Sequence, residues 1–187
     1  MYIHKTAEVS EDSLIGEGTK IWNQAQIREG VIIGRGCVIS KNVYIDHGVV
    51  IGNNVRIQNN SSIYSRATLE DGVFIGPHVC FTNHRVPRAI HPDGTPLAPN
   101  DWTPGHIHIK YGAAVGANTT ILTDITIGRW ALIGCGAIVT KDVPDYGLVV
   151  GCPARLIDYV CKCGLKFGDR RVCEDCNTQK PENRQVS

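Results

Sequence analysis

Apolar residues recur at every sixth position from Ile3 to Phe81, and this repeat constrains the fold more than any other feature. A small or β-branched residue follows four positions after each of them up to Ile75, from Ala7 to Val79. An amphipathic helix would need apolar spacings of three and four, which this pattern lacks. Two inward positions followed by a turn describe a short strand and a corner, so three repeats would close one triangular coil of 18 residues.

Glycine recurs at the longer period of 18 residues, at Gly16, Gly34 and Gly52. A glycine at such a corner indicates either a positive φ or a close approach of two backbones. Successive coils would stack about 4.8 Å apart through parallel ladders. The sequence therefore predicts an all-β fold, a parallel β-helix of about seven coils, with its main domain over residues 1–156.

The repeat stops after Phe81 and resumes in a new phase from Ile109 to Val139. The change of phase corresponds to an insertion of 22 residues, 85–106. Long loops on rigid scaffolds often carry function, so we expect a projecting functional loop here. Its five prolines are Pro87, Pro92, Pro96, Pro99 and Pro104.

The register predicts which polar residues meet at the root of this loop. Residues 18 apart should lie on adjacent coils, with 22 added across the insertion. Asn83 and His84 would then lie at the loop root, with Arg66 one coil below and Asp124 one coil above. An imidazole between a guanidinium and a carboxylate would support proton transfer. The alternative interpretation is an ordinary solvated corner.

Charge and composition argue against several classes of function. The formal net charge of +1 over 187 residues gives no extended footprint for nucleic acid or an anionic membrane. The apolar runs are shorter than the roughly 18 residues needed to span a bilayer. The first residues also lack the layout of a signal peptide, so we expect a cytoplasmic protein with reduced cysteines.

Four cysteines cluster near the end of the chain, as the pairs Cys161/Cys163 and Cys173/Cys176. Two such pairs match a four-thiolate structural zinc site, although the first pair is more tightly spaced than usual. The alternative is four free thiols in a frayed tail. We expect residues 157–187 to form a small C-terminal cap with bound zinc, ending in a disordered tail from Gln179.

Residues 3–156 resemble the hexapeptide-repeat acyltransferases, whose coil is left-handed. The segment Gly151-Cys152-Pro153-Ala154-Arg155 looks like the closing motif of acetyl-CoA-dependent members. Phe81-Thr82-Asn83-His84 and Pro87-Arg88-Ala89 resemble sugar-nucleotide N-acetyltransferases, closest to those that acetylate the 3-amino group of UDP-2-acetamido-3-amino-2,3-dideoxyglucuronate. Those enzymes often have aspartate where this chain has His84, which weakens a universal catalytic role for this position.

This resemblance implies acetyl transfer from acetyl-CoA to a sugar amine in polysaccharide biosynthesis, by a homotrimer. Asn83 would hold the amine and His84 would accept its proton. Tyr64, Arg66 and Arg88 would bind the anionic groups of the sugar nucleotide. A backbone N–H at Gly116 or Gly134 would stabilise the oxyanion. The predicted acetyl-CoA-binding residues are Gly116, Gly134, Ala137, Lys141 and Arg155.

Three other functions fit the same fold. An O-acetyltransferase would need His84 as an obligatory base, because a hydroxyl requires proton removal more than a neutral amine does. A non-catalytic scaffold would bind neither CoA nor a nucleotide sugar. A metalloenzyme like the γ-type carbonic anhydrases would need three histidines, and the candidates are His47, His78, His84, His106 and His108.

Overall fold

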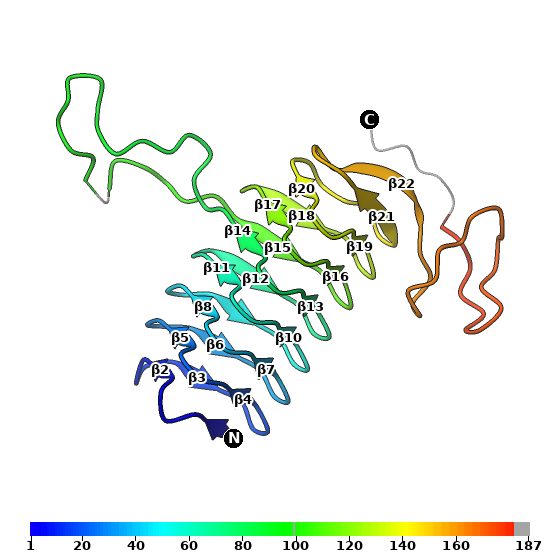
Figure 1. Cartoon of the computed structure of the whole chain (residues 1–187), viewed down its shortest axis with the longest axis horizontal. Coiled ribbons are helices and arrows are strands. Elements are labelled where there is room, and N and C mark those ends of the chain that lie inside the picture. The colour runs from blue at the N-terminus through cyan, green and yellow to red at the C-terminus, as the bar shows by residue number, and fades with distance from the viewer. Residues whose placement is uncertain (99, 182–187) are drawn as a thin grey trace.

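The computed structural model describes residues 1–98 and 100–181, and in this part of the chain it contains strands but no helix. These residues accordingly include no helix of the length and apolarity needed to cross a membrane. Short strands stack into a three-sided coil, from which one long loop projects near its middle (Figure 1). The N-terminus lies at one end of the coil and the cysteine-rich cap at the other. The predicted β-helix is therefore confirmed.

The coil has three sheets, and each turn of the chain contributes one strand to each of them. Within the described residues, the first sheet holds β1 (Tyr2–Ile3), β4 (Lys20–Ile21), β7 (Val38–Ile39), β10 (Arg56–Ile57), β13 (Phe74–Ile75), β16 (Ala114–Val115), β19 (Leu132–Ile133), β21 (Gly147–Val150) and β22 (Arg155–Tyr159). The second holds β2 (Glu8–Val9), β5 (Gln26–Ile27), β8 (Tyr44–Ile45), β11 (Ser62–Ile63), β14 (Cys80–Phe81), β17 (Thr120–Ile121) and β20 (Ile138–Val139). The third holds β3 (Leu14–Ile15), β6 (Ile32–Ile33), β9 (Val50–Ile51), β12 (Ala67–Leu69), β15 (Ile107–Ile109) and β18 (Ile125–Ile127).

The strand register follows the period of the sequence. It steps by 18 residues from Ile21 to Ile39, and by 40 from Ile75 to Val115, where the 22-residue loop intervenes. All pairs inside the coil are parallel, so each apolar residue lies over its counterpart in the previous coil. The predicted length of the insertion is therefore confirmed.

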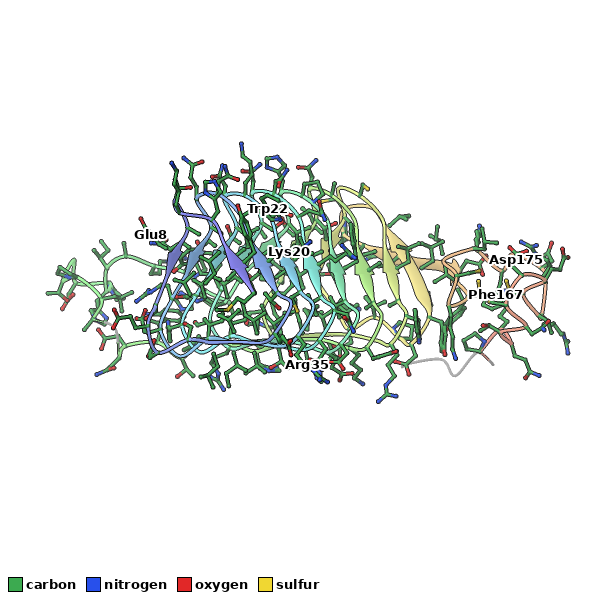
Figure 2. The ribbon with its side chains drawn as sticks, turned by 90° about the horizontal axis from the view of Figure 1, so that it is seen from below. Glu8, Lys20, Trp22, Arg35, Phe167 and Asp175 are labelled. Atoms are coloured by element: carbon green, nitrogen blue, oxygen red, sulfur yellow. The ribbon has the colours of Figure 1, made fainter. Side chains whose placement is uncertain are left out.

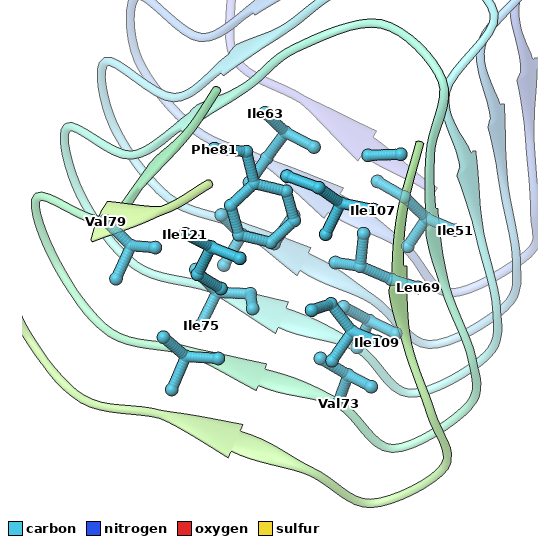
Figure 3. Packing of buried hydrophobic residues seen from close by; sticks show 14 of the residues in the cluster. Ile51, Ile63, Leu69, Val73, Ile75, Val79, Phe81, Ile107, Ile109 and Ile121 are labelled. Carbon is cyan, nitrogen blue, oxygen red and sulfur yellow. The ribbon is translucent and has the colours of Figure 1, made fainter. Parts of the chain in front are cut away.

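Stacked aliphatic side chains fill the interior of the coil. Ile21, Ile39 and Ile57 are completely buried along one sheet. Phe81 closes the first run of repeats and lies between Ile63 and Ile121 (Figure 3). Each fully buried side chain of this size contributes about 1.5–3 kcal/mol, so the repeat itself supplies most of the stability of the coil.

Close backbone approach explains the glycines at the 18-residue period. A Cβ added to Gly34 would lie 2.6 Å from the carbonyl carbon of Gly52, and one on Gly16 would lie 2.5 Å from that of Gly34. Positive φ occurs two positions later in the repeat, for example 67° at Gly36 and 55° at Asn54. Of the two interpretations of these glycines, close approach is therefore the correct one.

The coil ends where the strand direction reverses. β22 pairs antiparallel with β21, so the predicted boundary between residues 156 and 157 falls inside a strand that joins coil and cap. The cap extends past the last coil, as Phe167 and Asp175 show in Figure 2. The predicted disordered tail from Gln179 does not include its first two residues. Gln179 forms a β-bridge with Val172, and Lys180 Nζ lies 3.2 Å from Asp158. The rest of the predicted tail, 182–187, lies outside the described residues.

Candidate active site at the root of the inserted loop

The two ends of the inserted loop are joined to the coil at one corner, between the second and third sheets. The carbonyl of Asn83 accepts a hydrogen bond of 2.8 Å from the N–H of Gly105. The guanidinium of Arg66 donates a hydrogen bond of 2.6 Å to the carbonyl of Pro104. A Cβ on Gly105 would overlap the side chain of Thr123, so this position needs glycine for close approach. The loop root is thus tightly built.

His106, not His84, lies between Arg66 and Asp124. The registers of β12, β15 and β18 place His106 in that column, and its N–H donates a 3.1 Å hydrogen bond to Asp124 Oδ1. Partial burial lowers the pKa of His106, and the charges of His108 and Arg66 lower it further. The predicted column was therefore wrong for His84, because the chain leaves the coil there and returns at His106.

His84 lines a small cavity beside the next coil. Its ring stacks on Trp102 of the loop, with the ring centroids 4.4 Å apart. The cavity has a volume of about 110 Å³, enough for an acetyl group or a few waters but not for a nucleotide sugar. Its other lining residues are Thr82, Arg85, Leu122, Thr123, Ile125 and Thr140.

Thr123 also has a buried hydroxyl, which lies against Gly105 and has no hydrogen-bond partner among the described residues. Buried hydroxyls are usually satisfied, so an unpaired one beside a cavity indicates a place for a ligand or water. Thr123 was not predicted as a site residue. The pattern contained no signal for it, because threonine is common at such corners.

A buried carboxylate lies on the same edge of the coil, below the loop root. Asp46 accepts hydrogen bonds from Tyr44 Oη at 3.0 Å, His47 N at 2.9 Å and Ser65 N at 3.1 Å. Arg28 lies 3.3 Å from it as an ion pair. Burial by itself would raise the pKa of Asp46, but the hydrogen bonds from His47, Tyr44 and Ser65 outweigh it and leave the pKa lowered.

This carboxylate connects to Asn83 through one residue. Ser65 donates its backbone N–H to Asp46, and its hydroxyl accepts a 3.3 Å hydrogen bond from Asn83 Nδ2. The side chain of Asn83 is therefore oriented by a fixed network. Asp46 was not predicted as a site residue, although it lies one coil from Tyr64.

The predicted substrate-binding residues differ in their surroundings. Tyr64 is 38% exposed and packs edge-on against Tyr44, with ring centroids 5.7 Å apart. Arg88 is exposed on the loop and donates to the carbonyl of Pro87. Arg66 is engaged at the loop root. Tyr64 and Arg88 thus present accessible groups, whereas Arg66 supports the loop.

Three of the predicted CoA-binding residues take part in the hydrogen bonds or the core of the coil. The N–H of Gly116 donates to the carbonyl of Ile133 at 2.9 Å, and that of Gly134 to Val149 at 2.8 Å. Ala137 is completely buried in the core. The hypothesis that Gly116 or Gly134 supplies an oxyanion donor is therefore wrong, because ladder bonds already use these groups. The remaining two, Lys141 and Arg155, are exposed.

The four C-terminal cysteines converge as predicted. The Sγ atoms of Cys161, Cys163, Cys173 and Cys176 all lie within 4.8 Å of one another. Across the described part of the chain, no comparable metal-binding group forms among the histidines that a carbonic anhydrase-like site would need.

Comparison with known proteins supports the repeat. Residues 12–47 and 48–83 each match the family model described as bacterial transferase hexapeptide (six repeats). The match to this repeat thus covers residues 12–83. The resemblance predicted from the sequence is confirmed by this match.

Curated relatives match over part of the repeat region. The chain is 45% identical over 74 residues to dTDP-3-amino-3,6-dideoxy-alpha-D-galactopyranose 3-N-acetyltransferase of Aneurinibacillus thermoaerophilus, a match that covers 38% of each protein. It is 43% identical over 63 residues to the bifunctional protein GlmU of Rubrobacter xylanophilus, covering 34% of this chain and 14% of that protein. The matched segments thus span less than two fifths of these relatives.

Solved structures share the fold over most of the chain. The acetyltransferase domain of PglB from Neisseria gonorrhoeae, in complex with acetyl coenzyme A, aligns with a TM-score of 0.55 at 21% identity, covering 83% of this chain and 56% of that one. A hexapeptide-repeat acetyltransferase from Vibrio cholerae aligns with a TM-score of 0.56 at 22% identity, covering 71% and 72%. At these identities the likeness supports the β-helix alone.

Proposed function

We propose that this chain is an acetyl-CoA-dependent N-acetyltransferase acting on the amino group of a nucleotide-linked amino sugar. One observation carries the proposal: His84 and Thr123 line one cavity at the loop root, and Asn83, the residue before His84, is held by a hydrogen bond to Ser65. The 45% identical relative acts, by its name, on the 3-amino group of a dTDP sugar. The acceptor proposed from the sequence, UDP-2-acetamido-3-amino-2,3-dideoxyglucuronate, also carries a 3-amino group. A nucleotide-linked 3-amino sugar is therefore the proposed acceptor class.

The proposed reaction is direct transfer without an acyl-enzyme. The lone pair of the neutral amine attacks the thioester carbon, a C–N bond forms, and the C–S bond breaks to release CoA. His84 takes the proton from the amine nitrogen and returns it to the departing thiolate. Asn83, oriented through Ser65, holds the amine in line with the thioester.

Thr123 replaces the glycine N–H groups as the proposed oxyanion donor. Its hydroxyl has no other partner in the described residues, so after rotation toward the cavity it would donate to the thioester oxygen as negative charge develops. The cavity that it lines is large enough for the acetyl group. The rest of each substrate would lie outside this cavity. Tyr64 and Arg88 would bind the sugar nucleotide, and Lys141 and Arg155 would bind the phosphates of CoA.

A homotrimer is part of the proposal. Leu14, Ile32 and Val50 lie at successive ladder positions on the outer face of the third sheet and are 64%, 44% and 41% exposed. A contiguous apolar stripe of this kind suits contact with another subunit. Sedimentation equilibrium should give three times the chain mass, and a monomer at all concentrations would remove this part of the proposal.

The test is acetyl transfer across UDP- and dTDP-linked amino sugars, followed by release of the CoA thiol. We expect turnover with a 3-amino sugar and an amide in the product by mass spectrometry. His84→Asn should lower kcat by about tenfold to a hundredfold. The matched control is His78→Asn, an exposed histidine at another corner, which should leave kcat unchanged.

Two results would contradict the proposal. An ester in the product, with complete loss of activity in His84→Asn, would indicate O-acetylation. No binding of CoA or of any nucleotide sugar would indicate a scaffold protein.

A further inference from the structure

The cap is built from two turns that each present a pair of thiols. The first turn is closed by the Cys161 N–H, which donates to the Leu165 carbonyl at 3.0 Å, and Gly164 follows the pair with a φ of 88°. The second is closed by the Cys173 N–H, which donates to the Thr178 carbonyl at 2.9 Å, and Asn177 follows with a φ of 51°. Two similar turns therefore direct four sulfurs toward one point.

The sulfur positions fit a tetrahedral metal ion. A zinc ion with Zn–S bonds of about 2.3 Å separates its four sulfurs by about 3.8 Å. Here Cys163 Sγ and Cys173 Sγ are 3.6 Å apart, and all four Sγ atoms lie within 4.8 Å of one another. All four cysteines are free of disulfides. All four thiols are present, and small shifts of their sulfur atoms would bring them to the separations found around a zinc ion.

The cap is too small to hold itself together by apolar burial. It comprises 25 residues, 157–181, and units below about 40 residues usually require a metal, a disulfide or a partner. Its buried cluster consists of Tyr159, Phe167, Cys161 and Cys173, with Tyr146 packed against it. Two of these are the thiols themselves, so loss of the metal would remove the centre of the cluster.

We propose that Cys161, Cys163, Cys173 and Cys176 bind one structural zinc ion, which fixes the cap across the end of the coil. The N–H of Val160 donates to the carbonyl of Tyr146 at 2.8 Å, so the metal turns are joined directly to the last corner of the coil. A four-thiolate zinc site carries a net charge of about −2. Residues 157–181 hold five basic side chains against four acidic ones, so they offset only part of this charge.

Metal analysis of the full chain, purified without chelator, tests the proposal independently of any enzymatic activity. We expect about one zinc per chain, and a loss of about tenfold or more in the double variant Cys173→Ser/Cys176→Ser. Cys135→Ser and Cys152→Ser are the matched controls, because these exposed cysteines lie outside the cluster, and both should retain the full zinc content. Cobalt loading should produce the visible absorption of a tetrahedral thiolate site.

Hydrogen exchange of the wild-type chain separates metal loss from misfolding of a variant. Removal of zinc by chelator should raise exchange over residues 159–180 and leave the coil strands protected. A zinc-free chain with four titratable thiols that fails to take up added zinc would overturn the proposal. Disulfides between the cap cysteines, or iron in place of zinc, would also overturn it.

Discussion

The coil and the cap form their buried cores in different ways. The core of the coil extends along its whole length, so that Ile21 and Ile133 are both completely buried in one cluster. The cap gathers its core around Phe167 and four thiols. The first arrangement makes stability additive along the chain, whereas the second concentrates it in one cluster. A core substitution in the coil should therefore destabilise the coil, whereas one in the cap should act mainly on the cap.

The largest effect should come from the coil interior. Ile57→Ala removes a completely buried side chain from the middle of a stacked column, so the free energy of unfolding should fall by about 2–5 kcal/mol. Guanidinium unfolding followed by circular dichroism measures it. Arg56→Ala, the adjacent exposed residue of β10, is the control and should change stability by less than about 0.5 kcal/mol. Equal effects in the two variants would mean that the columns do not carry the stability.

Loss of the cap core should have a smaller effect on the coil. Phe167→Ala should open residues 159–180 to hydrogen exchange and move the unfolding midpoint of the coil little, because Phe167 belongs to the cap cluster and not to the core of the coil. Mass spectrometry of exchanged peptides measures both regions at once. Equal loss of protection in β10 and in the cap would show that the two regions fold as one unit.

Asp46 should contribute less to the stability of the coil than the interior columns do. At pH 7, Asp46→Asn should lower stability by about 1–3 kcal/mol, because a buried carboxylate loses its charge-assisted hydrogen bonds. The folded pKa of Asp46 is lowered, so its stabilisation is present above the unfolded value of about 3.9 and disappears as pH falls through the folded value. The stability difference between variant and wild type should therefore shrink below about pH 4. A difference that is constant from pH 7 to pH 3 would contradict this origin.

The sequence predicted the coil well because its signal is periodic. The six-residue spacing alone placed Ile39 over Ile21 and set the length of the insertion. Gly34 shows the limit of the pattern, since the same spacing was compatible with positive φ or with close approach. Only the stacked backbones at Gly52 decide between them.

The register predicted that Asn83 and His84 lie at the loop root, but not how the residues around them are arranged. Asn83 and His84 do lie at the loop root, as the register required. The pattern does not show how a non-periodic insertion leaves and re-enters the coil, so it put His84 where His106 lies. Thr123 was missed for a related reason: an unpaired hydroxyl depends on which groups surround it in three dimensions.

The most direct test of the site is the kcat of acetyl transfer to a nucleotide-linked 3-amino sugar in Asn83→Ala, compared with Asn59→Ala. Both asparagines lie at corners of the coil, but Asn59 is exposed and remote from the loop root. We expect Asn83→Ala to lower kcat by about tenfold or more, since the amine loses its alignment with the thioester, and Asn59→Ala to match the wild type. Equal kcat in the two variants would contradict an active site at the loop root.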